Sequence, residues 1–242
     1  PASAFTLSGG EARANGPRNY IRTVASDYNT LDFRAEIIYR MQGGGGAAGL
    51  FFGLGAAEVD PGYYNEPLHS VYAIDHAQDF PIYQGTVIRS LPSSGQPQGF
   101  FGWLDDATRS DGQHALRLLK RGDQLTWQMD HLYEAALGFV PTYSNTMTLA
   151  AVPFLNAANS RLFFGTEASP TRILELRVTP LPPVLEVARS GNSVIVSWPL
   201  RHGAGWQLQV NTNLSLSTAW TGLPPPYPTN ATHHVVTEPT PT

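Results

Sequence analysis

The sequence predicts an all-β protein that consists of two antiparallel β-sandwiches, a larger one followed by a smaller one. Glycine (23) and proline (20) are abundant, whereas only 14% of the 242 residues are charged. This composition suits short strands joined by many turns. Apolar and polar residues alternate along several segments, and we find no convincing helical period longer than about two turns.

The clearest predicted strand covers residues 31–41. Its apolar residues occupy every second position, which places one face in a core and the other in water; they are Leu31, Phe33, Ala35, Ile37, Tyr39 and Met41. Further strands are expected at 19–26, 47–54, 70–76, 85–91, 146–155, 161–166 and 172–180. Residues 114–130 predict a hairpin that turns at Arg121-Gly122-Asp123. The best candidate for a short helix is 131–137.

Tandem prolines at Pro182-Pro183 predict the boundary between the domains, because they cannot continue a central strand and form a stiff linker. We therefore expect one domain at 1–181 and another at 182–242. In the second domain, Val194, Val196 and Trp198 form an alternating apolar stripe.

Several classes of protein are excluded or not expected. The chain has no cysteine, which excludes disulfides, a thiol nucleophile and a cysteine-bound zinc. A net charge of −4 without a basic run argues against a nucleic-acid partner. No apolar run approaches the ~18 residues that a membrane span needs, so membrane insertion is not expected. The chain begins at Pro1, as a processed chain would, and we expect a secreted protein at the extracellular surface.

Residues 1–181 resemble the concanavalin A-like lectin/glucanase superfamily, in particular the laminin-G-like domains of secreted bacterial proteins. The resemblance rests on Phe5-Thr6-Leu7, on 33–37, on 161–165 and on 173–178. It implies an antiparallel jelly-roll sandwich. It covers most of the segment and is more specific for the fold than for function.

Residues 184–238 resemble the small fibronectin type III-like modules that end many bacterial surface proteins, an Ig/fibronectin III-like sandwich. The resemblance rests on 190–199, 206–209 and 214–220. Such modules finish with another strand, whereas here a Pro/Thr tail follows Glu238, so the domain is predicted to lack its last strand. A truncation explains this gap, and so does a strand donated by another copy of the chain. The candidate donor strand contains Phe5 and Leu7, and it equally suits the first strand of its own domain.

Three aspartates, Asp105, Asp106 and Asp111, surround residues 107–110. Calcium prefers several carboxylate and carbonyl oxygens, and the laminin-G-like resemblance implies one Ca²⁺. An ordinary solvated turn explains the same residues. His76 and Asp79 lie near Asp75 and form either part of a metal site or a polar cluster at the end of a strand.

Exposed aromatic residues suggest a glycan-binding surface, because tyrosine and tryptophan rings stack on the apolar faces of sugars. Tyr63, Tyr64 and Trp103 are the main candidates, and packing in the core or at its rim is the alternative.

Catalysis is not expected. Glu58-Val59-Asp60 lacks the second glutamate of the family 16 glycosidase motif. The seven histidines include His69, His76, His114 and His131, and no pair has the HExxH spacing. Two functions from different classes follow: an extracellular structural or adhesion protein that polymerises into a surface filament by strand donation, or a carbohydrate-binding accessory module of a larger secreted protein.

Overall fold

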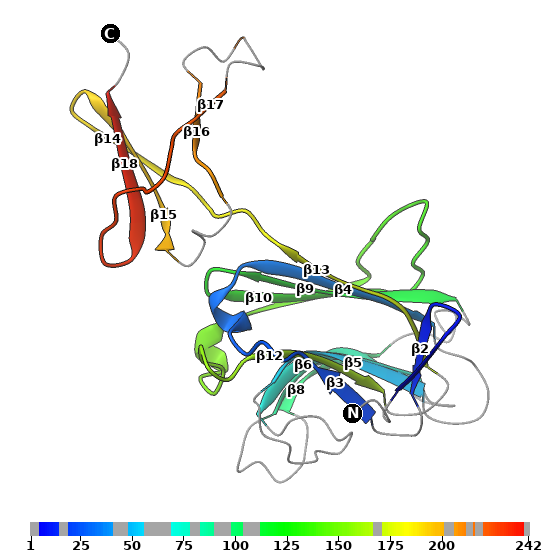
Figure 1. Cartoon of the computed structure of the whole chain (residues 1–242). Helices are drawn as coiled ribbons and strands as arrows, with labels where there is room; N and C mark the ends of the chain where they lie inside the picture. Colours follow the sequence, from blue (N-terminus) through cyan, green and yellow to red (C-terminus); the bar gives the residue numbers. More distant parts are fainter. Residues whose placement is uncertain are drawn as a thin grey trace. The chain divides into compact units, whose positions relative to one another are not determined.

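A computed structural model describes residues 5–14, 19–40, 48–55, 69–77, 83–89, 98–103, 112–166, 171–200, 206–211, 215 and 220–239. The chain forms two compact units, Pro1–Pro180 and Leu181–Thr242 (Figure 1). The described residues form strands and short turns, which confirms the predicted all-β class. Among them, no helix is long and apolar enough to cross a membrane.

A seven-stranded sheet forms one layer of the first unit, in the order β1-β2-β13-β4-β9-β10-β11. Its neighbouring strands are antiparallel. The bounds are β1 Phe5–Ser8, β2 Glu11–Ala14, β4 Phe33–Arg40, β9 Gln113–Arg121, β10 Gln124–Asp130, β11 Tyr143–Thr148 and β13 Arg172–Pro180.

A six-stranded antiparallel sheet forms the second layer, in the order β3-β12-β5-β6-β7-β8. Figure 1 shows the two layers stacked face to face. The bounds are β3 Asn19–Arg22, β5 Ala48–Gly55, β6 Ser70–Ala77, β7 Tyr83–Arg89, β8 Gln98–Trp103 and β12 Arg161–Thr166.

The alternation predicted for β4 is confirmed: Phe33, Ala35, Ile37 and Tyr39 are all buried. The start of the strand differs from the prediction. Leu31 is 36% exposed and follows a 3-10 turn at Tyr28–Thr30, so the chain becomes extended only after this turn. Met41 lies outside the described residues.

The predicted hairpin is confirmed, with β9 and β10 joined at Gly122-Asp123. Gly122 has a φ of +55°, a conformation that glycine adopts without steric cost. Its amide donates a hydrogen bond to Asp32 Oδ1 at 2.9 Å, and the Lys120 ammonium donates one to its carbonyl. These contacts hold the Arg-Gly-Asp turn as part of the framework.

Two other predictions for this unit are wrong. Residues 131–137 form turns rather than a helix, because the Asp130 carboxylate binds the amides of Leu132 and Val140 and curls the loop around itself. The strand predicted at 146–155 ends at Thr148, where a 3-10 turn at Leu149–Ala151 begins.

The main core lies between the two sheets. Trp127 of β10 is fully buried, and its indole N–H donates to the Phe52 carbonyl of β5 at 3.2 Å. This bond joins one sheet to the other and satisfies the one polar atom of the ring. A second buried apolar cluster, which includes Phe51, Tyr72 and Phe163, lies on the other face of the six-stranded sheet. That sheet is therefore apolar on both faces.

The second unit contains the three-stranded sheet β14-β15-β18 and the pair β16-β17. The bounds are β14 Glu186–Ser190, β15 Ser193–Pro199, β16 Gln209–Val210, β17 Thr221–Gly222 and β18 His233–Pro239. Trp198 is buried here, and its ring lies 5.0 Å from that of Tyr227 and 5.2 Å from that of His234. The fibronectin type III-like identity of this unit and its missing last strand stay predictions.

Candidate functional site

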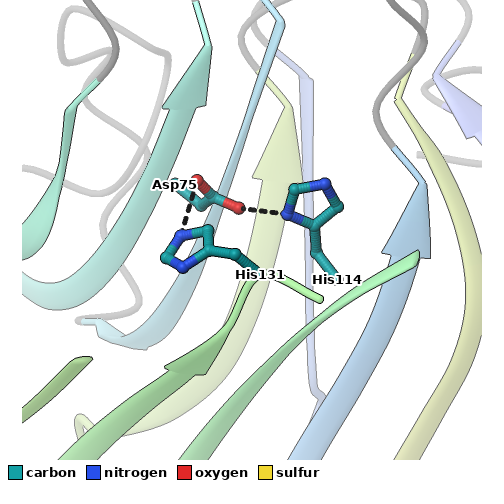
Figure 2. A group of neighbouring side chains, drawn as sticks. All are labelled: Asp75, His114 and His131. Carbon is teal, nitrogen blue, oxygen red and sulfur yellow. Dashed lines mark ion pairs between the residues drawn. The ribbon is translucent and has the colours of Figure 1, made fainter. Parts of the chain in front are cut away.

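Three ionisable side chains meet inside the first sandwich: Asp75, His114 and His131. Asp75 belongs to β6 of the six-stranded sheet, His114 to β9 of the seven-stranded sheet, and His131 follows β10 directly. Figure 2 shows both imidazole rings directed at the carboxylate. Each residue is only 1% exposed. We call these residues the acid–histidine cluster.

The strand registers explain why these residues meet. Ala115 pairs with Asp130 at the end of the β9–β10 ladder, which brings His131 beside His114. Tyr39 pairs with His114 across β4 and β9, and directly opposed residues point to the same face. In β6, Asp75 has the same parity as Val71 and Ala73, which lie in the main core. The carboxylate therefore points at the opposite sheet.

The geometry around Asp75 is tight. His114 Nδ1 lies 3.3 Å from Oδ2, and His131 Nε2 lies 3.4 Å from Oδ1. The Tyr39 hydroxyl donates a hydrogen bond to Oδ2. On the far side of its ring, His131 Nδ1 lies 2.6 Å from Thr142 Oγ1. The cluster thus ties the two sheets together through polar groups within an otherwise apolar core.

Burial and the neighbouring charges shift the pKa values of Asp75 and Tyr39. Burial by itself raises the pKa of the Asp75 carboxyl, but the positive charge that His131 and His114 carry when protonated, together with their close contacts to the carboxylate, holds it well below its ordinary value. For Tyr39, burial and then the neighbouring Asp75 charge raise the pKa of the phenol well above its usual value. Asp75 is therefore an anion and Tyr39 a neutral donor.

This donor set does not suit Ca²⁺. Calcium takes six to eight oxygen ligands, whereas two of the three groups offer imidazole nitrogens. The nitrogens and the carboxylate instead match the ligands that zinc and related transition metals prefer. The three donor atoms lie within 4.8 Å of one another.

A second feature is a pocket of about 220 Å³ on the outer face of the seven-stranded sheet. We call it the outer-face pocket. Its lining comes from β4, β9, β13 and the loop after β10, and comprises Arg34, Glu36, Ile38, Ala115, Arg117, Tyr133, Phe139, Glu175 and Arg177.

Charged groups in the outer-face pocket hold one another in place. Arg117 donates two hydrogen bonds to Glu36 Oε1, at 3.0 and 2.8 Å, and Arg34 Nε lies 3.1 Å from Glu36 Oε2. The Arg117 guanidinium also lies 3.8 Å from the centre of the Phe139 ring, within the range of a cation–π contact. Arg177 pairs with Glu175.

The aromatic residues predicted to bind sugar are only partly described. Tyr63 and Tyr64 lie outside the described residues. Trp103 ends β8 and pairs with Tyr83. The described strands that flank Tyr63 and Tyr64 end where Gly55 pairs with Ser70, at the opposite end of the six-stranded sheet. The sheet therefore places Gly55 and Ser70 at the end away from Trp103.

The predicted calcium ligands Asp105, Asp106 and Asp111 lie outside the described residues, so calcium at these positions stays a prediction.

The predicted donor strand is β1, which pairs with β2 of its own chain. Phe5 is 6% exposed and its ring lies 5.6 Å from that of Phe164, whereas Leu7 is 82% exposed. In the single chain, β1 is thus part of its own sandwich.

Neither the meeting of His114 and His131 with Asp75 nor the outer-face pocket was predicted from the sequence. The sequence signal for the cluster is the alternation of inward and outward positions along β9. His114 has the same parity as Leu116 and Leu118 in β9, so the alternation already directed this polar side chain inward.

No known protein family and no curated protein matches the sequence. Solved structures do match. The exoplasmic/lumenal domain of VIP36 in its Ca²⁺/Man3GlcNAc-bound form has a TM-score of 0.52 at 11% identity, covering 78% of this chain and 84% of that chain. Its Ca²⁺/Man2-bound form has a TM-score of 0.51 at 11% identity, covering 78% and 81%.

A further match is the CBM2 module of the evolved Dit of Lactobacillus casei BL23 phage J-1, with a TM-score of 0.49 at 14% identity, covering 72% of this chain and 77% of that chain. At such identities the VIP36 matches show similarity of fold alone. The chain thus shares a lectin-like β-sandwich fold with VIP36.

Proposed function

We propose that the first unit is a non-catalytic carbohydrate-binding domain, and that the outer-face pocket is its sugar site. The observation that carries this proposal is the hydrogen-bonded Glu36–Arg117 pair in the lining of a pocket that also contains Tyr133 and Phe139. Binding sites combine shaped apolar surface with a few oriented polar groups.

The pair suits sugar hydroxyls because it presents donors and acceptors side by side. The guanidinium has five N–H donors, and the carboxylate has about four acceptor sites, of which Arg117 and Arg34 engage only part. Mutual pairing keeps both side chains ordered before a ligand arrives, which lowers the entropy cost of binding. Tyr133, which is partly buried, adds an aromatic ring for the apolar face of a sugar.

The VIP36 domain supports this proposal at the level of the class of ligand. Its structures contain Ca²⁺ with Man2 or Man3GlcNAc, so this fold has held mannose-type glycans. We therefore choose mannose oligosaccharides as the first probes. The same likeness supports an extracellular or lumenal setting, in agreement with the secreted localisation that we propose.

Binding rather than hydrolysis fits the carboxylates of the pocket. A glycosidase needs one carboxylic acid that donates a proton and a second carboxylate across the scissile bond. Here Glu36 contacts Arg34 and Arg117, and Glu175 contacts Arg177. These contacts suit carboxylates that act as hydrogen-bond acceptors.

The test is a glycan array, followed by calorimetry with the best mannose oligosaccharide. We expect Arg117→Met and Tyr133→Ala each to weaken binding by tenfold or more, because each removes a polar or stacking contact. Arg189→Met, at an exposed position of the second unit, is the matched control and leaves binding unchanged.

The same experiment tests the other proposed sites. Loss of binding in Tyr63→Ala, Tyr64→Ala or Trp103→Ala, with normal binding in Arg117→Met, would move the sugar site to the aromatic residues. A requirement for Ca²⁺ that disappears in Asp105→Asn would support calcium at Asp105, Asp106 and Asp111. An array without any bound glycan, from a well-folded protein, would overturn the proposal.

A further inference from the structure

We propose that Asp75, His114 and His131 form a structural site for a divalent transition-metal ion such as Zn²⁺, enclosed between the two sheets of the first unit. The three donors come from two layers of the sandwich and are each 1% exposed. An ion held by all three would cross-link the sheets.

The hydrogen bonds of Thr142 determine where neutral His131 carries its proton. Thr142 Oγ1 lies 3.1 Å from the Met129 carbonyl oxygen, which only accepts hydrogen bonds, so the threonine hydroxyl donates there. With its hydroxyl proton directed at Met129, Thr142 Oγ1 accepts from His131 Nδ1, 2.6 Å away. The proton of neutral His131 therefore sits on Nδ1, and its lone pair is on Nε2.

The lone pair on His131 Nε2 faces the Asp75 carboxylate at 3.4 Å. Two acceptors cannot face each other in a buried site unless a positive species lies between them. His131 Nε2 and Asp75 Oδ1 are both buried, and neither has a hydrogen bond of good geometry within the described part of the chain. A second proton on His131 would leave an ion pair at 3.4 Å, whereas a metal ion would bind both atoms directly, and the refolding experiment below distinguishes the two.

The separations of the donor atoms match metal coordination. Zinc binds imidazole nitrogen and carboxylate oxygen at about 2.0–2.1 Å, and two ligands of a tetrahedral ion at that distance lie about 3.3–3.4 Å apart. The contact of His114 with Asp75 Oδ2 and that of His131 with Asp75 Oδ1 measure 3.3 and 3.4 Å, whereas the three donor atoms as a set lie within 4.8 Å of one another, so the two imidazole rings would have to move closer together around an ion. An ion thus fits among these atoms with small side-chain movements.

The surrounding residues also orient the ligands as metal sites require. Metal-bound histidines usually donate the other ring N–H to a nearby acceptor, and metal-bound carboxylates accept hydrogen bonds. His131 Nδ1 donates to Thr142, and the Tyr39 hydroxyl donates to Asp75. Both partners would keep these bonds with an ion present. Because the site is enclosed, we expect the ion to enter during folding and to exchange slowly.

The first experiment uses the whole chain without substitutions. The protein is unfolded in a denaturant that contains a chelator, freed of metal, and refolded with or without Zn²⁺. Its metal content and melting temperature are then measured. We expect about one Zn²⁺ per chain and a higher melting temperature with zinc. Refolding with Co²⁺ should give visible absorption bands of an ion bound by nitrogen and oxygen, with the second Asp75 oxygen or a water molecule as the fourth ligand.

Three variants locate the site. Asp75→Asn, His114→Gln and His131→Gln should each reduce bound Zn²⁺ at least tenfold, whereas His233→Gln in the second unit should retain it. Zinc bound equally by all variants would overturn the assignment. If the unsubstituted chain refolds with less than a tenth of an equivalent of zinc and an unchanged melting temperature, the cluster is an ion pair without metal, and the proposal is wrong regardless of how the variants fold.

Discussion

Two buried charged clusters lie at opposite ends of strands β4 and β9, and their polar atoms find hydrogen-bond partners in different ways. The first pairs Asp32 with Lys120, where β4 begins and β9 ends. The second is the acid–histidine cluster, where β4 ends and β9 begins. Lys120 is 0% exposed and Asp32 5%, so both clusters face the same cost of burying charge.

The main chain completes the first cluster. The Gly122 amide donates a hydrogen bond to Asp32, and the Gly122 carbonyl accepts one from the Lys120 ammonium. A two-residue turn thus supplies a partner for each charged group. At the other end of these strands, Asp75 Oδ1 and His131 Nε2 lack such hydrogen bonds among the described residues. This difference indicates that the first cluster belongs to the framework, whereas the second keeps two polar atoms that an ion could bind.

The largest expected effect comes from breaking the completed cluster. Lys120→Met should lower the free energy of unfolding by about 3–5 kcal/mol, because it leaves the Asp32 carboxylate buried without its cation. Urea denaturation measures the change. The double variant Asp32→Asn with Lys120→Met should recover part of the loss. A Lys120→Met protein as stable as the parent would mean that the two clusters do not differ in this way.

The next effect separates the clusters by their dependence on metal. At a free Zn²⁺ concentration 100 times its Kd, the parent should gain about 2.7 kcal/mol of stability. Asp75→Asn should lose this gain, and Lys120→Met should keep it. Urea denaturation with and without Zn²⁺ provides the measurement. A gain that Lys120→Met also loses would show that zinc stabilises the protein elsewhere.

A smaller effect concerns the donors around Asp75. Tyr39→Phe should destabilise the fold by about 1–3 kcal/mol, because it removes a hydrogen-bond donor from a buried carboxylate. Tyr143→Phe is the matched control. Its hydroxyl has a contact to Thr86 at 3.2 Å and lies in a partly buried position, so its loss should have the smaller effect. Thermal unfolding of the two variants tests this order.

The smallest effect on stability should come from the outer-face pocket. Arg117→Met breaks an ion pair in which the side chains are 18–20% exposed, and we expect a loss of no more than about 1 kcal/mol. The same substitution should greatly weaken glycan binding. A large loss of stability would instead make Arg117 part of the framework, like Lys120.

Alternation made much of the larger sandwich predictable. The spacing of Phe33, Ile37 and Tyr39 gave the inward face of β4, and the Gly122-Asp123 turn gave the β9–β10 hairpin. The prediction failed where contacts from elsewhere decide the local structure. Residues 131–137 form turns because the Asp130 carboxylate binds two amides of the loop, a contact that no local pattern reveals.

The candidate sites depended on long-range pairing. Asp75 and His114 belong to strands of different sheets, and His131 reaches them only through the register of β9 and β10. Likewise, Glu36, Arg117 and Arg177 form one surface because β4 lies between β9 and β13.

The sequence by itself determined that the chain is all-β and which side of most strands faces inward, because a period of two fixes the side of every residue in a strand. Only the tertiary structure decided which inward polar residues meet. The order and register of strands in two sheets are set by contacts distant in the sequence, and they place one acid beside two histidines.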